Sequence, residues 1–299
     1  MPDFSIFKNN KPFQKFILLL LTLVGFYIIV PIFFMLLAML IWSKDVVSGG
    51  MTAETPINYL IYVQLFTQVF VFGGAALFFA AITDAKPLRF LGVNVVKNYK
   101  LLLFPAIAIV FVIPLSSWLL QMSLSVSVPE SWQPFFDSMR TQEELGNNLM
   151  MRFLNVNGIG WLLFNLFFLA VIPAICEELL FRGALIGSLK LMIKNKHLLV
   201  IVSAIIFSAI HLQFFSFLSR FALGLILGYA YVYSGSIIPA MVAHFVNNAL
   251  SVISFYFSDR SSISEVGSFD NVWLLIISSL SALIMVFWMR KIHNNECKV

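Results

Sequence analysis

Polar side chains interrupt the apolar second half of the chain at a few positions, and their types are those used in acid–base chemistry. They are Glu177, Glu178, Arg182, His211, His244 and Asn248. Most fall within apolar stretches long enough to cross a membrane, where each charged side chain costs about 2.5–3.5 kcal/mol. Three charges on one such helix cost on the order of 8–10 kcal/mol if they stay unpaired. We therefore expect these groups to be paired, hydrated or functional.

The two adjacent acids differ in the partner that their own helix offers. Glu178 and Arg182 are four residues apart, so a helix places them on one face as an ion pair. Glu177 points about 100° away and has no cation on its own helix. Pro173 lacks an N–H group and predicts a bend close to the acids. A purely structural ion pair would account for Glu178 and Arg182, but it does not account for Glu177.

The histidines follow helical spacing too, because His244 and Asn248 are four residues apart and share a helix face. Glu177 and His211 each lie about 20 Å along their helices from a basic loop, so they can meet at one depth. His244 joins them in one of two ways. Either the turn before its helix lies inside the bilayer boundary, or the helix with the acids projects into the cytoplasm.

This set of groups suits the hydrolysis of an amide bond. Such a reaction needs a water molecule, a base that takes its proton, and donors that stabilise the developing oxyanion. Glu177 is the candidate base, and His211 could hold the water or shuttle its proton. His244 and Asn248 could donate to the oxyanion. The neighbouring ion pair would fix the helix.

A divalent metal site is the alternative chemistry, with Glu177, His211 and His244 as zinc ligands. The helical zinc-protease pattern of two histidines four residues apart around a glutamate is absent from the chain. A carboxylate paired with Arg182 is also a poor ligand. We therefore favour a mechanism without a metal and predict no obligatory cofactor, with zinc as the alternative.

Three segments together resemble a known motif set: Cys-Glu-Glu-Leu-Leu-Phe-Arg-Gly (176–183), Phe-Ser-Ala-Ile-His (207–211) and His-Phe-Val-Asn-Asn (244–248). They are similar to the CPBP family of intramembrane proteases, which contains the CAAX prenyl endopeptidase Rce1 and the bacterial Abi proteins. The family pattern is E-E-x-x-x-R, F-x-x-x-H and H-x-x-x-N, in this order. The resemblance covers about residues 158–257.

The resemblance implies a role for each matching position. Glu177 matches the general base of the family, and the acid–arginine pair beside it matches the supporting pair. His211 matches the histidine that binds the water. His244 and Asn248 match the oxyanion side. Asn247 lies outside the pattern, and we expect it to pack or to form a hydrogen bond.

The composition indicates which type of secondary structure carries these residues. Hydrophobic residues make up 60% of the 299 residues, charged residues make up 11%, and mean hydropathy is +0.93. Soluble proteins carry about 25% charged residues, so the chain is predicted to be a polytopic, all-α membrane protein. The net charge of +5 does not indicate nucleic-acid binding, because the basic residues lie mainly between apolar runs.

Crossing a bilayer core about 30 Å thick takes about 20 helical residues. Eight candidate spans are 16–42, 58–82, 101–120, 158–189, 198–212, 215–233, 237–257 and 272–289. Residues 127–157 mix aromatic and acidic side chains and predict a helix on the membrane surface, without a catalytic role. With eight spans, most of the 19 basic residues lie on one side, which predicts a multi-pass protein of the cell membrane with both termini cytoplasmic.

We expect a single membrane domain over residues 1–299. Its parts are an N-terminal region with three spans and the surface helix (1–157), a core that carries the motifs (158–257), and a last span with a tail (258–299). The spans would form a bundle with a cavity within the bilayer, into which the site opens.

The resulting hypothesis is an intramembrane endopeptidase that acts on a membrane protein or a lipidated peptide, with a prenylated CAAX sequence as one option. The alternative is a non-enzymatic membrane protein, either a bacteriocin self-immunity factor or a scaffold that regulates a membrane complex. A transporter with a proton relay is less favoured, because the intramembrane charges all lie in the second half and no internal repeat is found.

Overall fold

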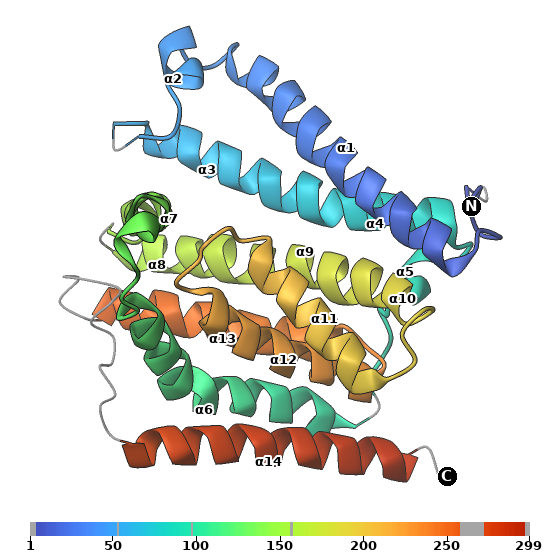
Figure 1. Ribbon diagram of the computed structural model, residues 1–299. Coiled ribbons are helices and arrows are strands. Elements are labelled where there is room, and N and C mark those ends of the chain that lie inside the picture. The colour runs from blue at the N-terminus through green and yellow to red at the C-terminus, as the bar shows by residue number, and fades with distance from the viewer. Residues whose placement is uncertain (1–3, 53, 97, 156–157, 258–271, 297–299) are drawn as a thin grey trace.

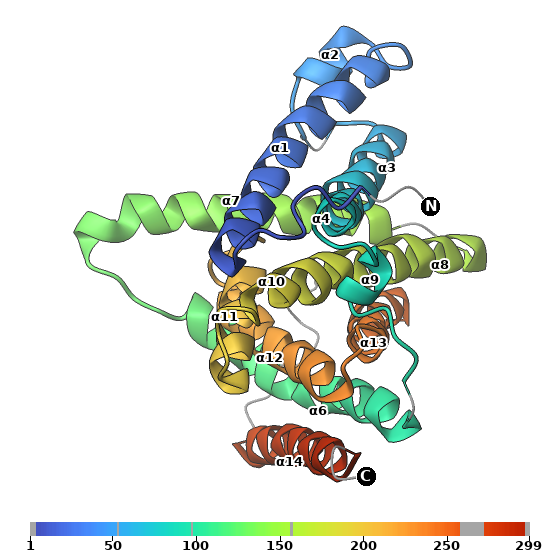
Figure 2. The ribbon, with the colours of Figure 1, turned by 90° about the vertical axis from the view of Figure 1, so that its right-hand side faces the viewer.

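The computed structural model describes residues 4–52, 54–96, 98–155, 158–257 and 272–296. Every regular element within these ranges is a helix, so the predicted all-α class is confirmed. Figures 1 and 2 show that α1 (Pro12–Ala38) and the α3–α4 helix form one edge of the bundle. The last helix, α14 (Val272–Glu296), forms the opposite edge.

Seven helices of the described chain are long and apolar enough to cross a membrane. They are Pro12–Ala38 (α1), Ile57–Thr83 (α3, η1 and α4), Tyr99–Leu124 (α6), Ile159–Leu189 (α8 to α10), Phe217–Ser234 (α12), Ile238–Phe257 (α13) and Val272–Glu296 (α14). The expected number of eight is reached only if α11 (Lys196–Ala209) is included. Its 14 residues span about 21 Å, less than the bilayer core, and the helix ends at Ala209, three residues before the end of the predicted span over 198–212.

Two of the long helices contain π-helical segments beside the polar residues. The second span consists of α3 (Ile57–Phe66), η1 (Thr67–Gly74) and α4 (Ala75–Thr83). The fourth consists of α8 (Ile159–Asn165), η3 (Leu166–Val171), α9 (Ile172–Glu178), η4 (Leu179–Ile186) and α10 (Gly187–Leu189). Pro173, which predicts a bend, lies at the start of α9. The helix changes there from the π-helical segment η3 to an α-helix. Such wide turns are frequent at functional sites.

Helix α11 lies against α12 through two glycines. A Cβ atom on Gly224 would lie 3.1 Å from the Cβ atom of Ala204, and one on Gly228 would lie 2.8 Å from Cγ1 of Val200. These approaches require residues without side chains, so the spacing of the two glycines serves close helix packing. This contact fixes the end of α11 beside the helices that carry the acids.

Most of the segment predicted as a surface helix forms α7 (Gln133–Leu154), and Figure 2 shows it extending away from the bundle. That it lies on the membrane surface stays a prediction, and residues 156 and 157 of the segment lie outside the described residues. Most of its side chains are exposed, but Glu143 is buried. The Oε2 atom of Glu143 accepts a hydrogen bond of 2.9 Å from the Phe215 N–H, and Oε1 accepts one from the Ser216 hydroxyl. These bonds anchor α7 to the connection between α11 and α12.

The start of α1 and the end of α14 lie on the same side of the bundle in Figure 1. This arrangement is compatible with two termini on one side of a membrane. That this side is cytoplasmic stays a prediction from the distribution of basic residues.

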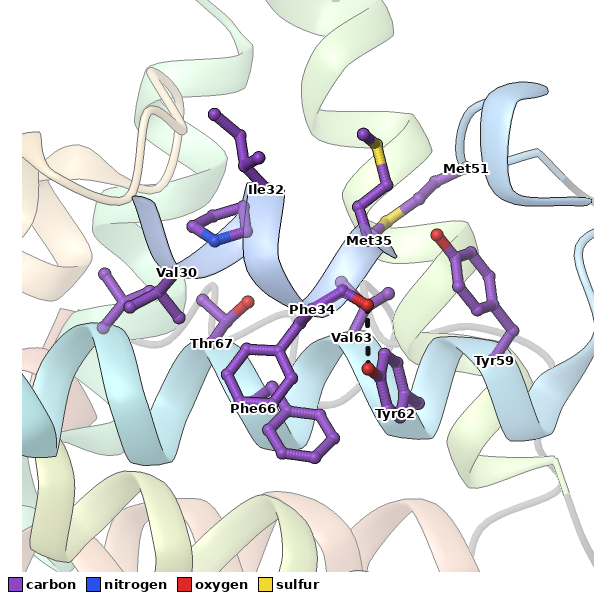
Figure 3. A pocket seen from close by; sticks show the side chains of 12 residues that line it. Val30, Ile32, Phe34, Met35, Met51, Tyr59, Tyr62, Val63, Phe66 and Thr67 are labelled. Carbon is purple, nitrogen blue, oxygen red and sulfur yellow. Dashed lines mark hydrogen bonds between the residues drawn. The ribbon is translucent and has the colours of Figure 1, made fainter. Parts of the chain in front are cut away.

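A cavity of about 260 Å³ lies between α1 and the α3–η1 helix (Figure 3). Its walls are mainly apolar and aromatic, and the Tyr62 hydroxyl donates a hydrogen bond of 2.8 Å to the Phe34 carbonyl beside it. Thr67 and Val71 of η1 line this cavity. None of the six predicted site residues does, so the expectation that the site opens into a cavity stays a prediction.

Candidate active site

Residues from five parts of the fold meet around the two adjacent acids. The contributing side chains are Glu177 and Glu178 at the end of α9, Arg182 in η4, His211 after α11, His244 in α13 and Gln68 in η1. The predicted convergence of the acids with both imidazoles is therefore found. The residues come together because α9 packs against both η1 and α13.

Glu178 lies at the centre of a buried network. Its Oε1 atom accepts a hydrogen bond of 2.8 Å from Arg182 and a second bond of 2.8 Å from Nδ1 of His244. The side chains of Glu178 and Arg182 are fully buried, and the predicted ion pair between them is confirmed. Arg182 also donates to the Gly224 carbonyl at 3.3 Å, and its guanidinium lies 4.6 Å from the centre of the Phe207 ring. One cation thus connects the acids to both α11 and α12.

Glu177 faces a different set of partners, although it is the neighbouring residue. Its Oε1 atom accepts a hydrogen bond of 3.1 Å from Nε2 of Gln68. Its Oε2 atom lies 3.9 Å from Nε2 of His211 and 3.8 Å from Nε2 of His244. These two distances are too long for direct hydrogen bonds and lie in the range that a single bridging water molecule spans.

The hydrogen bonds of the two imidazoles define which nitrogen faces Glu177. Nδ1 of His211 lies 2.8 Å from the Phe207 carbonyl, which can only accept, so Nδ1 is the donor. Nδ1 of His244 donates to the Glu178 carboxylate. In both rings Nε2 is therefore directed toward Glu177, and it offers a lone pair whenever the ring is neutral.

Exposure differs among these groups and indicates the open side of the cluster. The His211 side chain is 26% exposed, whereas those of Glu177 and His244 are 8% and 5% exposed. His211 therefore lies at the edge of the cluster and Glu177 lies below it. The cluster is therefore most accessible on the His211 side.

Asn248 lies one turn after His244 on α13, and its carboxamide is held by neighbours. Its Nδ2 atom donates to the Leu169 carbonyl at 3.3 Å, and its Oδ1 atom accepts from Nδ2 of Asn247 at 3.0 Å. The expected hydrogen bond of Asn247 is thus found. No hydrogen bond within the described residues connects Asn248 to the ionisable groups, so its place on the oxyanion side stays a prediction.

Gln68 is the contact that the sequence did not reveal. It lies in the second predicted span, 109 residues before Glu177. A carboxamide within an apolar run is a signal, but Gln64 gives the same signal one turn earlier. Only the packing of η1 against α9 shows that Gln68, and not Gln64, contacts Glu177.

No group of three His, Cys, Asp or Glu side chains in the described part of the chain is arranged to hold a metal ion. The zinc alternative of Glu177, His211 and His244 nevertheless stays a prediction. The Nε2 atoms of the two histidines lie 3.9 Å and 3.8 Å from Oε2 of Glu177, and each ring has a carbonyl or carboxylate partner at Nδ1 that orients it.

The fold and the cluster together define a multi-pass membrane protein with two acids, an arginine and two imidazoles gathered among its helices. Residues 159–250 match the family model of the type II CAAX prenyl endopeptidase Rce1-like proteins. The matched range contains all three motifs, so the chain carries an Rce1-like domain and the resemblance to the CPBP intramembrane proteases is confirmed. Comparisons with curated proteins and with solved structures give no match.

Proposed function

We propose that this protein is an intramembrane endopeptidase that hydrolyses a peptide bond with a water molecule activated by Glu177. The observation that carries the proposal is the position of Glu177 Oε2, which lies 3.9 Å and 3.8 Å from the Nε2 atoms of two histidines. A water molecule held among these three atoms has a base beside it and is shielded from the lipid. The Rce1-like domain, which belongs to a protease family, supports the same reaction class.

The chemistry follows from the partners of that water. Glu177 removes a proton from the water while its oxygen attacks the substrate carbonyl carbon, and the carbonyl oxygen becomes an oxyanion. The proton then passes from Glu177 to the amide nitrogen as the C–N bond breaks. The products are a carboxylic acid and an amine, and Glu177 returns to its ionised form.

The histidines have separate tasks in this proposal. His211, at the exposed edge, holds the water through the lone pair of Nε2. His244 lies deeper and serves the oxyanion. When both of its nitrogens carry protons, Nε2–H can donate to the substrate oxygen, and Glu178 is then its counter-ion. The second amide hydrogen of Asn248 is a further donor on the same helix face.

Glu178 and Arg182 hold His244 in position and do not contact the substrate. Their ion pair binds His244 on one side and the α12 backbone on the other. The imidazole is thereby held with Nε2 toward Glu177. Such partners of catalytic groups act through orientation rather than through contact with the substrate.

The substrate in this proposal is a membrane-associated protein or a lipidated peptide in the cell membrane, and a prenylated C-terminal sequence is one candidate. A cluster placed among membrane helices favours a peptide that approaches through the bilayer. Both termini of the protein would face the cytoplasm.

The test is cleavage of a lipidated peptide by the purified protein in proteoliposomes. Glu177→Gln is expected to lower kcat about 10²- to 10⁴-fold, the usual contribution of a general base. Glu144→Gln, an exposed acid on α7, is the matched control and should cleave as the wild type does. Equal cleavage by wild type and Glu177→Gln would overturn the proposal and favour a non-enzymatic immunity or scaffold role.

A further inference from the structure

Gln68 connects the N-terminal helices to the candidate base. Its side chain is 8% exposed, and its Nε2 atom donates to Oε1 of Glu177 at 3.1 Å. The other carboxylate oxygen of Glu177 is the one that faces the histidines. The two oxygens of the acid thus have different partners, and Gln68 holds the one on the side away from the imidazoles.

We propose that Gln68 is a positioning residue that fixes the carboxylate of Glu177 with Oε2 directed at the water between the histidines. This inference rests on the proposed function and adds a residue outside the three motifs. A carboxylate at the end of a flexible side chain needs a second anchor, because rotation about its last bonds would exchange or displace the two oxygens. A neutral donor gives this anchor without adding a charge to the site.

The helix that carries Gln68 is itself held firmly against the helix that carries the acid. A Cβ atom on Gly73 would lie 3.2 Å from Sγ of Cys176, so η1 and α9 are closely packed one residue before Glu177. Gln68 belongs to the π-helical turn of the same segment. Thr67 and Val71, in the same turn, line the apolar cavity on the α1 side. The segment therefore separates that cavity from the acid.

A purely structural role does not suit this glutamine. Its Oε1 atom is buried and has no hydrogen-bond partner among the described residues. Burying a carboxamide with one polar atom unsatisfied costs free energy, whereas an apolar side chain of similar shape would avoid this cost. The unpaired Oε1 atom is thus a cost of having a glutamine here, and the bond that Nε2 donates to Glu177 gives a reason for its presence.

The experiment compares Gln68→Met, which keeps the shape of the side chain, with Gln64→Met as the matched control on the same helix. Gln64 is partly exposed and precedes Gln68 by one turn. Cleavage of a lipidated peptide and thermal unfolding are measured on the full-length protein. For Gln68→Met we expect kcat to fall about 10- to 100-fold, as for the loss of a hydrogen bond to a charged group, with KM unchanged. The Tm should stay close to that of the wild type, because the loss of the bond to Glu177 and the removal of the unpaired Oε1 atom have opposite effects. Gln64→Met should change neither kcat nor KM.

A lower Tm with unchanged kcat for the folded Gln68→Met protein would overturn the positioning role, because Gln68 would then serve stability alone. If this variant does not fold, Gln68→Glu decides the question. Its carboxylate either repels Glu177 or shares a proton with it, so kcat must fall in both cases if the two side chains touch.

The two proposals fail in different ways. Cleavage that depends on Glu177 but not on Gln68 removes the positioning role and leaves the endopeptidase. Cleavage that is independent of Glu177 removes both.

Discussion

The Nδ1 atom of His244 and the Oε1 atom of Glu178 lie 2.8 Å apart, and the same oxygen accepts the hydrogen bond of Arg182. Two donors on one carboxylate oxygen make Glu178 a junction between helices rather than a free acid. The neighbouring acid, Glu177, has no such cation and faces two ring nitrogens. Glu178 therefore orients its neighbours, whereas Glu177 is the candidate base.

Arg182→Lys tests this junction. A lysine would lose the bond to the Gly224 carbonyl and the stacking of the guanidinium on Phe207. Because the pair is fully buried, we expect a loss of about 3–5 kcal/mol in unfolding free energy, similar to breaking a buried ion pair. The measurement is denaturant unfolding in detergent. Arg89→Lys, at an exposed arginine, is the control. A stability equal to that of the wild type would contradict this prediction, because a positive charge beside Glu178 would then be sufficient without the other contacts of the guanidinium.

The difference in exposure between the two histidines predicts different responses to chemical rescue. His211→Ala and His244→Ala should each lower kcat about 10²- to 10⁴-fold. Added imidazole should restore part of the activity of His211→Ala, because that side chain is 26% exposed. It should not restore His244→Ala, whose side chain is 5% exposed and whose removal leaves Glu178 without one donor. The readout is the cleavage rate against imidazole concentration. Equal rescue of both would contradict the predicted order of access.

The helical class and the convergence of the motifs could be predicted from the sequence because both depend on local rules. Apolar runs of about 20 residues define the spans, and four-residue spacing defines a helix face. The ion pair of Glu178 and Arg182 follows from spacing alone. The histidines could be assigned to the same cluster because a polar side chain within a membrane is costly unless it contacts another polar group.

The contacts between distant elements could not be predicted. The choice of Gln68 over Gln64 depends on how η1 rotates against α9, and a π-helical turn alters that rotation. The bond from His244 to Glu178, rather than to Glu177, depends on the packing of α13. The predicted end of α11 lies three residues too late because the apolar pattern continues after Ala209, where the helix ends.

The close contact between α11 and α12 gives a prediction for the stability of the protein. Gly228→Ala would place a methyl group 2.8 Å from Cγ1 of Val200 and should cost about 1–3 kcal/mol of stability. Val200→Ala should make the glycine substitution less costly, and a double-mutant cycle measures this coupling. Gly25→Ala, with no atom within 4 Å of the new methyl group, is the control and should be neutral or slightly stabilising. Additive effects of Gly228 and Val200 would contradict direct contact.

Chelation separates the water-based mechanism from the zinc alternative. The water-based mechanism uses only Glu177 and the two histidines around a water molecule, the same three side chains that the zinc alternative would use as ligands. For the water-based mechanism we expect dialysis against 1,10-phenanthroline or EDTA to leave the cleavage rate unchanged, with a metal content well below one ion per chain. Loss of activity that only zinc restores would instead assign Glu177, His211 and His244 as ligands. In that case His211→Ala should also lower the bound zinc, an effect that a water-binding histidine would not produce.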